Sequence, residues 1–208
     1  MSDIVNRIHA HVEAHGDERI SLLKNKEVIR WLFHDTSFLP PTSGRTAKER
    51  LNTNIENENN WGRSVMRLRR PDLAFGNQWT GPFGEYLCEE IYTLLGKECS
   101  VPENINGLEP DRQIDNNIIE SKTQTYFTPG TAGEKILGVP FKYADVPELY
   151  VKPLIIVCIG RAEKLCRETY GILPGPSCTP KKQRFLDFYK QEGITFIGAT
   201  DLLKQLIA

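Results

Sequence analysis

The chain has 208 residues, and its 26 basic and 27 acidic side chains leave a formal net charge of −1. This length fits one domain, or one domain with an extension. A hydrophobic fraction of 39% and a charged fraction of 25% fit a soluble globular protein that can bury a core. The balanced charge also excludes a strongly basic nucleic-acid-binding protein, so any contact with nucleic acid must come from clustered cations.

The cysteine pattern and the hydropathy of the chain bear on its location. The five cysteines form no C-x-x-C pair, which predicts reduced thiols and argues against a zinc site. The polar stretch at residues 1–10 differs from a signal peptide, and no apolar stretch reaches the length of a membrane span. We therefore expect a cytoplasmic protein without a membrane partner.

In chain order, residues 1–75 predict a helical N-terminal extension. Apolar residues recur at helical spacing over 3–15 and over 21–33, and prolines then mark a loop. A further helix is expected to start at 46–54. The Asn- and Glu-rich residues 52–60 predict a loop or an exposed turn.

The densest basic cluster of the chain lies within residues 63–70, just after this Asn- and Glu-rich segment. Arg63, Arg67 and Arg70 lie at helical spacing and would form one basic edge. Two interpretations stay open: a solvated or ion-paired helix face, and a surface that contacts DNA phosphates.

Residues 76–208 predict alternating helices and strands. Phe83, Leu87 and Ile91 line one side of a helix over 83–95, which Gly96 closes. An uninterrupted apolar run at 153–159 is typical of a strand buried on both faces of an α/β sheet. The other predicted elements are strands at 99–101 and 193–198 and helices at 131–137, 161–170, 181–191 and 201–207.

Residues 109–125 predict a β-hairpin. Asn116-Asn117 suits its turn, because Asn tolerates the left-handed backbone conformation, and strands over 112–115 and 118–123 would pair. The face with Ile114 and Ile119 is predicted to be buried. The other face would carry Asp111, Gln113, Glu120 and Lys122.

Burying two carboxylates and an ammonium group on one face costs free energy, so their presence there favours a functional role. Carboxylate oxygens suit Mg²⁺, and a neighbouring lysine can position a water or offset charge on a phosphate. This equipment fits metal-assisted phosphodiester hydrolysis. The alternative is an exposed hairpin with ordinary surface charges.

Pro110-Asp111 followed by Glu120-Ser121-Lys122 resembles the motif of the PD-(D/E)XK nuclease superfamily, the fold of many restriction endonucleases. The resemblance implies an αβββαβ core, with a central mixed sheet flanked by helices, over residues 76–208. It implies Asp111 and Glu120 as Mg²⁺ ligands and Lys122 as the lysine beside the attacking water. It also implies a further ligand, Glu85, from the preceding helix.

Three choices stay open within this assignment. Asp115 is a rival to Asp111, and Glu89 is a substitute for Glu85, one helical turn further on. The assignment also depends on the hairpin register, in which Gln113 is expected to face Glu120. A slip of one residue would move the acids to the other face.

The resemblance implies a Mg²⁺-dependent, site-specific endodeoxyribonuclease that cleaves double-stranded DNA, similar to type II restriction enzymes. We expect a homodimer that treats both strands symmetrically. A repair, junction-resolving or homing nuclease, or a non-catalytic nucleic-acid-binding module, is the alternative. The candidate DNA-binding residues are Arg63, Arg67, Arg70, Gln124, Lys135 and Lys142, and the same loop also offers Thr131 and Tyr143.

Overall fold

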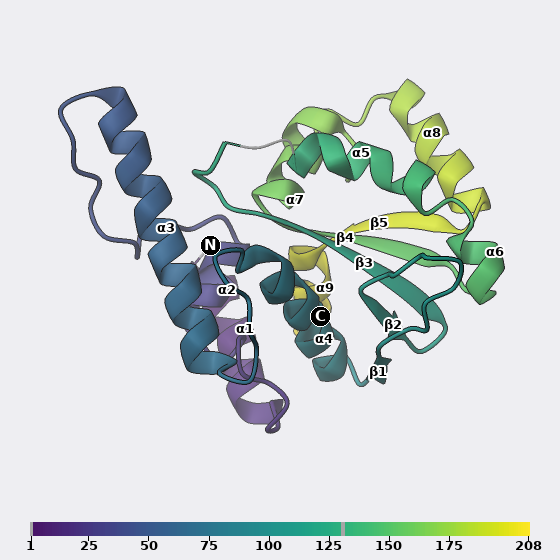
Figure 1. Cartoon of the computed structure of the whole chain (residues 1–208), viewed down its shortest axis with the longest axis horizontal. Coiled ribbons are helices and arrows are strands. Elements are labelled where there is room, and N and C mark those ends of the chain that lie inside the picture. Colours follow the sequence, from purple (N-terminus) through teal and green to yellow (C-terminus); the bar gives the residue numbers. More distant parts are fainter. Residues whose placement is uncertain (1, 130–131) are drawn as a thin grey trace.

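A five-stranded mixed sheet with helices on both faces forms the centre of the computed structural model, which describes residues 2–129 and 132–208 (Figure 1). The first three strands pair antiparallel, and the last three pair parallel. The predicted α/β class and the helix-flanked mixed sheet are confirmed. In their order across the sheet, the strands are β1 (Cys99–Ser100), β2 (Arg112–Ile114), β3 (Asn117–Gln124), β4 (Leu154–Gly160) and β5 (Ile194–Gly198).

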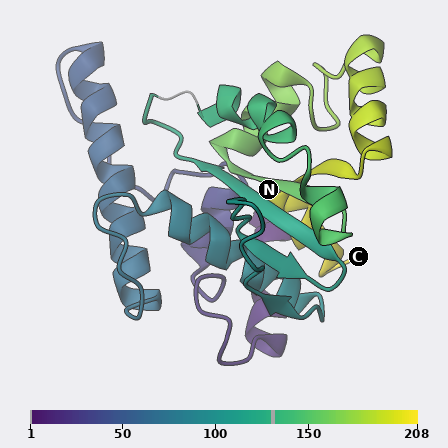
Figure 2. The ribbon, with the colours of Figure 1, turned by 45° about the vertical axis from the view of Figure 1, so that its right-hand side comes forward.

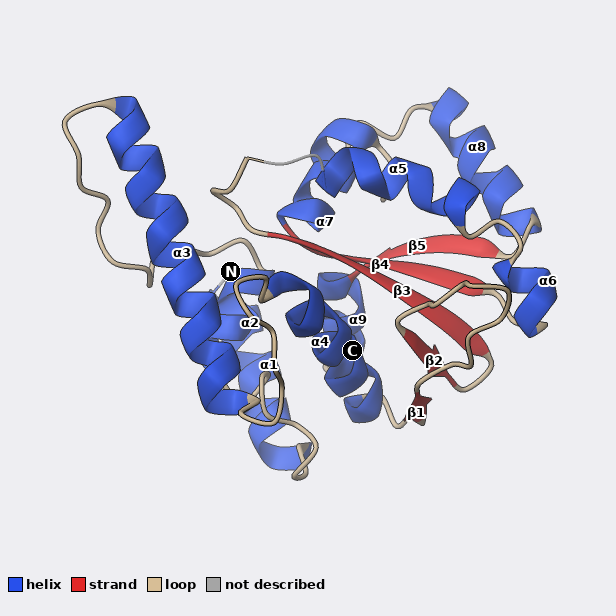
Figure 3. Cartoon of the chain, viewed as in Figure 1, coloured by secondary structure: helices blue, strands red, loops and turns tan. Residues whose placement is uncertain are grey.

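The helices form two layers around this sheet (Figure 3). On one face lie α5, α7 and α8, and on the other lie α4 and α9 together with the N-terminal helices α1 and α2. The described helices are α1 (Ser2–His15), α2 (Lys26–Leu32), α3 (Ala47–Arg69), α4 (Thr80–Leu94), α5 (Ala132–Lys142), α6 (Val146–Tyr150), α7 (Arg161–Leu165), the π-helix η1 (Cys166–Tyr170), α8 (Pro180–Gln191) and α9 (Ala199–Gln205).

The N-terminal helices share one hydrophobic core with the sheet. Ile8, Trp31 and Phe83 are completely buried in the same cluster as Ile119 of β3. Glu90 of α4 adds a polar connection, because its carboxylate accepts hydrogen bonds from three consecutive backbone N–H groups at residues 21–23. The predicted boundary near residue 75 therefore separates two segments that pack against each other.

The prediction of a loop at residues 52–60 is wrong, because one continuous helix of 23 residues, α3, runs through them. A capping box between Thr46 and Glu49 starts this helix. Glu58 lies within it and accepts hydrogen bonds from the indole of Trp31 and from the backbone N–H groups of residues 126 and 127. Tertiary contacts thus override the weak helix propensity of the Asn-rich segment.

The N-terminal half of α3 stands away from the rest of the molecule (Figures 1 and 2). The chain at 40–46 runs back along this half, and both are largely exposed. Hydrogen bonds connect the two, including Thr42 to Asn54 at 2.6 Å and Asn57 to the Pro40 carbonyl at 3.1 Å. We call this projection, residues 40–57, the arm.

Other helices differ from prediction at their ends. The second helix starts at Lys26 because the N–H groups at residues 21–23 bond to Glu90 instead. Helix α5 extends to Lys142, α6 was not predicted, and the helix expected over 161–170 divides into α7 and η1.

None of the helices within residues 2–129 and 132–208 combines the length and apolarity that crossing a membrane requires.

The hairpin forms with a register two residues away from the prediction. Gln113 pairs with Ile118, and the turn moves to Asp115-Asn116. Asp115 adopts the left-handed conformation there, with φ of 48°. Because a shift of two residues conserves the side-chain alternation, Glu120 stays on the predicted face.

Candidate functional site

The candidate site lies just before β2 begins, where one edge of β3 has no antiparallel neighbour. The ladder between these strands stops at the pair of Arg112 and Ile119. One residue beyond it, the Asp111 carboxylate accepts hydrogen bonds from the Ser121 backbone N–H at 2.7 Å and from its hydroxyl at 2.6 Å. These bonds replace strand pairing and fix Asp111 beside the stretch Glu120-Ser121-Lys122.

Glu120 is a buried carboxylate, with only 2% of its surface exposed. Its Oε1 accepts a hydrogen bond from the Lys122 ammonium group, whereas its Oε2 has no hydrogen-bond partner within the described residues. Burial and the nearby charge of Asp111 raise the pKa of Glu120, and Lys122 opposes this effect. An unpaired buried oxygen is unfavourable, so a cation or a water bound to Oε2 would stabilise this carboxylate.

Lys122 connects this carboxylate to a polar cleft of about 480 Å³. Its ammonium group also lies 3.2 Å from the Ser121 carbonyl oxygen. The cleft is lined by side chains from the start of α4, from the chain before β2, from β3 and from α5: among them are Glu85, Asp111, Lys122 and Lys135. Asp111 and Lys122 therefore line the same cleft.

Glu85 faces the same cleft from α4, but Arg112 holds it. The guanidinium group lies 3.4 Å from Glu85 and 3.0 Å from Glu89. Burial and Asp111 raise the pKa of Glu85, and Arg112 opposes the increase. Glu89, the substitute candidate, is thus held by the same cation.

Asp111 and Glu120 are the two candidate ligands for a magnesium ion. Within residues 2–129 and 132–208, no three His, Cys, Asp or Glu side chains lie close enough to hold a metal ion together. Asp111 and Glu120 nevertheless suit Mg²⁺, which usually binds one or two carboxylates and keeps several waters. The role of Glu85 as a third ligand stays a prediction.

Asp115, the rival of Asp111, lies away from this pair. It forms an ion pair with Lys97 at 3.0 Å and accepts a hydrogen bond from the Glu98 backbone. These contacts hold it at the exposed hairpin turn, so the structure favours Asp111.

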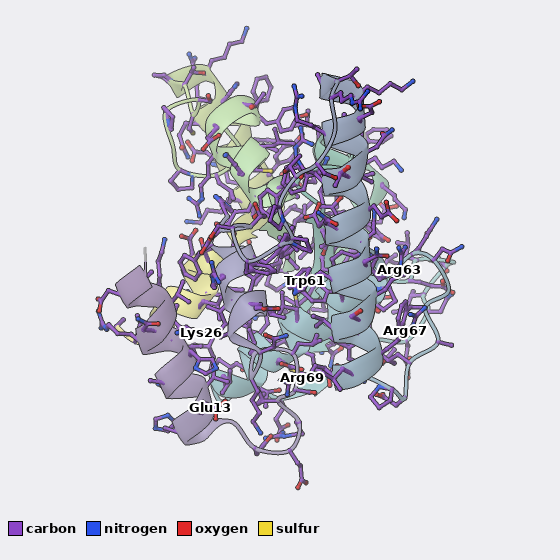
Figure 4. All side chains as sticks on the ribbon, turned by 90° about the vertical axis from the view of Figure 1, so that its left-hand side faces the viewer. Glu13, Lys26, Trp61, Arg63, Arg67 and Arg69 are labelled. Atoms are coloured by element: carbon purple, nitrogen blue, oxygen red, sulfur yellow. The ribbon has the colours of Figure 1, made fainter. Side chains whose placement is uncertain are left out.

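Arg63 and Arg67 extend from the same side of α3, as predicted for a basic edge (Figure 4). Arg67 is exposed, and Arg63 is half-buried with a hydrogen bond to Asn60. Arg70 lies at the end of the helix, where Asp72 binds its guanidinium group at 2.7 Å and the ring of Tyr86 packs against it. Of the three, Arg67 is the most accessible to a phosphate.

The candidate DNA-binding residues from Gln124 onward occupy different environments. Gln124 is buried at the end of β3, whereas Lys135 is exposed at the polar cleft. The Lys142 ammonium group lies 3.0 Å from the Tyr143 hydroxyl, and Tyr143 is buried. Thr131 lies outside the described residues.

Sequence reasoning missed three residues that shape the site: Ser121, Arg112 and Gly84. The first two are neighbours of predicted site residues, and a cation next to Asp111 is a signal for paired acids. Gly84 is a glycine inside a helix, which often marks a close approach of two elements. A Cβ atom at Gly84 would overlap the Thr123 hydroxyl oxygen, so the glycine lets α4 lie directly against β3.

Replacing Gly84 by alanine is expected to lower stability by about 2 kcal/mol and to displace Glu85, because α4 must move away from β3. Gly81→Ala adds the same methyl group to α4 in open space and should stabilise the helix by up to about 1 kcal/mol. Urea unfolding of both variants measures these changes. Equal stability of the two variants would contradict the close approach.

Comparisons of the chain with protein-family models, with curated proteins and with solved structures found no match. The assignment of the site therefore depends on the motif and on its geometry.

Proposed function

We propose that this protein is a Mg²⁺-dependent endonuclease that hydrolyses phosphodiester bonds of double-stranded DNA. The observation that carries the proposal is the buried Glu120 carboxylate near the charge of Asp111: its Oε1 binds the Lys122 ammonium group, and its Oε2 has no hydrogen-bond partner among the described residues. Hard oxygen donors beside a lysine match the requirements of metal-assisted phosphate chemistry.

Asp111 and Glu120 would hold the ion. When bound, Mg²⁺ supplies a Lewis acid that polarises the phosphate and lowers the pKa of a coordinated water. Lys122 would orient the attacking water and offset the charge of the phosphate. Ser121 keeps Asp111 in place through its two hydrogen bonds, and Arg112 reduces the repulsion among the acids.

The arrangement of elements supports the restriction-endonuclease-like interpretation. A helix, three antiparallel strands, further helices and a parallel strand follow one another in α4, β1, β2, β3, α5, α6 and β4, as in the αβββαβ order that the motif implies. We propose site-specific cleavage similar to that of type II restriction enzymes, with exposed cations such as Arg67 and Lys135 contacting phosphates. A repair, junction-resolving or homing nuclease would use the same site.

The test is cleavage of supercoiled plasmid by the purified protein with Mg²⁺ and with EDTA. Glu120→Gln is the active-site variant. Asp115→Asn is the matched control, because it removes an acid of the same hairpin that lies at the exposed turn.

Discrete fragments that require Mg²⁺, persist in Asp115→Asn and disappear in Glu120→Gln are the expected result. A smear with the same dependence would keep the nuclease but contradict site specificity, and would favour repair or degradation. Intact plasmid under all conditions, together with retained DNA binding, would overturn the proposal in favour of a non-catalytic module.

A further inference from the structure

An apolar surface is exposed on the face of the sheet that α5 and α8 cover. Helix α8 has no buried residue, and Phe185 and Phe188 are 58% and 54% exposed. On α5, Leu137 and Phe141 are 49% and 93% exposed. Large aromatic side chains in this state are typical of surfaces that a partner covers.

These side chains form one continuous surface. A groove of about 420 Å³ lies between Leu137 and Phe185, and a groove of about 240 Å³ lies between Phe141 and Phe188. Pro140 and Tyr189 line both grooves and thereby join them. We call this region, residues 137, 140 and 141 of α5 with residues 185, 188 and 189 of α8, the α5–α8 surface.

The exposed stripe of α8 is self-complementary. Lys181, Phe185, Phe188 and Glu192 follow one another at spacings of four, three and four residues, so they share one side of the helix, and all four are exposed. The two aromatic residues and the two charged residues are centred on the same point of the helix. Two copies of α8 packed antiparallel about that point would therefore place Phe185 against Phe188 and Lys181 against Glu192.

The charges at the ends of this stripe are placed unfavourably within one chain. Lys181 lies in the first turn of α8 and Glu192 is its C-terminal cap, opposite to the signs that the helix dipole favours. Neither takes part in an ion pair within the described residues. An antiparallel second helix brings an acid to the start of α8 and a cation to its end, which corrects both placements.

We propose that the α5–α8 surface is the interface of a symmetric homodimer, in which α8 packs antiparallel against the same helix of a second copy. In such an isologous contact each pair occurs twice, once on each side of the two-fold axis. The surface lies on the opposite side of the molecule from the arm, so the dimer leaves the arm free (Figure 2). The proposal is independent of the nuclease assignment.

The test is sedimentation of the full chain over about a hundredfold range of protein concentration. Wild type is expected to dimerise. Lys181→Glu and Glu192→Lys should each weaken the dimer about tenfold, because each creates two pairs of like charges. The double variant with both changes restores two pairs of opposite charges and should regain the wild-type affinity.

Control variants distinguish disruption of this interface from other causes of weaker dimerisation. Lys190→Glu reverses a charge on another side of α8 and should leave dimerisation unchanged. Phe185→Ser with Phe188→Ser should weaken the dimer about a hundredfold. Thermal unfolding monitors the fold, and both single charge reversals place charges that suit the helix dipole, so loss of the dimer cannot be ascribed to unfolding.

Three outcomes would contradict the proposal. If the protein is a monomer at every concentration, the α5–α8 surface is not a homodimer interface. If the dimer tolerates both single charge reversals, it forms through another surface. Failure of the double variant to recover would contradict the antiparallel pairing.

Discussion

Glu120→Gln is expected to reduce Mg²⁺-dependent cleavage about a thousandfold, because the amide removes the negative charge that would hold the ion. The same change should keep the free energy of unfolding within about 1 kcal/mol of wild type. Burial disfavours the charged form of Glu120 and raises its pKa, so a neutral amide is tolerated at this position, and the Lys122 ammonium group that loses its partner is partly exposed to solvent. Single-turnover cleavage and urea unfolding measure the two effects.

A measurement of Mg²⁺ binding shows whether the variant has lost the ion or only the catalytic step. Mg²⁺ should raise the melting temperature of wild type and of Asp115→Asn, and it should have a much weaker effect on Glu120→Gln. A full Mg²⁺ response in Glu120→Gln would show that the ion binds elsewhere. Unchanged cleavage by this variant would remove Glu120 from the mechanism.

Glu90→Ala is expected to lower the free energy of unfolding by about 3 kcal/mol. The truncation leaves three backbone N–H groups at residues 21–23 without their acceptor, and two of these hydrogen bonds are fully buried. Unfolding in urea, monitored by tryptophan fluorescence, measures the change. The helix α4 offers a control in Glu89→Ala, which removes a more exposed acid paired with Arg112 and should cost about 1 kcal/mol.

The effect of Glu90→Ala should also depend on pH. Burial raises the pKa of Glu90 above its usual 4.5. The stability that this group contributes is therefore complete below pH 4.5 and declines as the pH rises through the raised pKa of the folded state. The difference between wild type and variant should grow on acidification. If Glu90→Ala costs no more than Glu89→Ala, residues 1–75 do not depend on this connection.

The sequence pattern alone predicted those helices and strands whose buried side chains recur at the period of the helix or strand. The apolar residues of α4 and the uninterrupted run of β4 predicted both elements, because their buried faces repeat at helical or strand spacing. The hairpin was placed on the correct residues but with the wrong turn. Asp115 takes the left-handed position because Lys97 and the Glu98 N–H bind its side chain, and the sequence does not show these distant contacts.

The candidate site was predictable in part for the same reason. Glu120 and Lys122 are two residues apart on β3, so they share one face whatever the exact turn. An even register shift also keeps them on the same face as Gln113 of β2. The engagement of Glu85 by Arg112 was not predictable, since it depends on how α4 approaches β2. The continuity of helix α3 through residues 52–60 was missed because the fixed position of Glu58 comes from partners far along the chain, such as Trp31 and Tyr126.

The contacts of Glu58 have a consequence for how the chain matures during its synthesis. On the ribosome, this acid is made well before the backbone N–H groups of Tyr126 and Phe127 that bind its carboxylate. Until those residues emerge, burial of Glu58 would leave its charge largely uncompensated. A nascent chain that ends before β3 should therefore keep α3 undocked, and the first third of the protein becomes native only after the central strand has been translated.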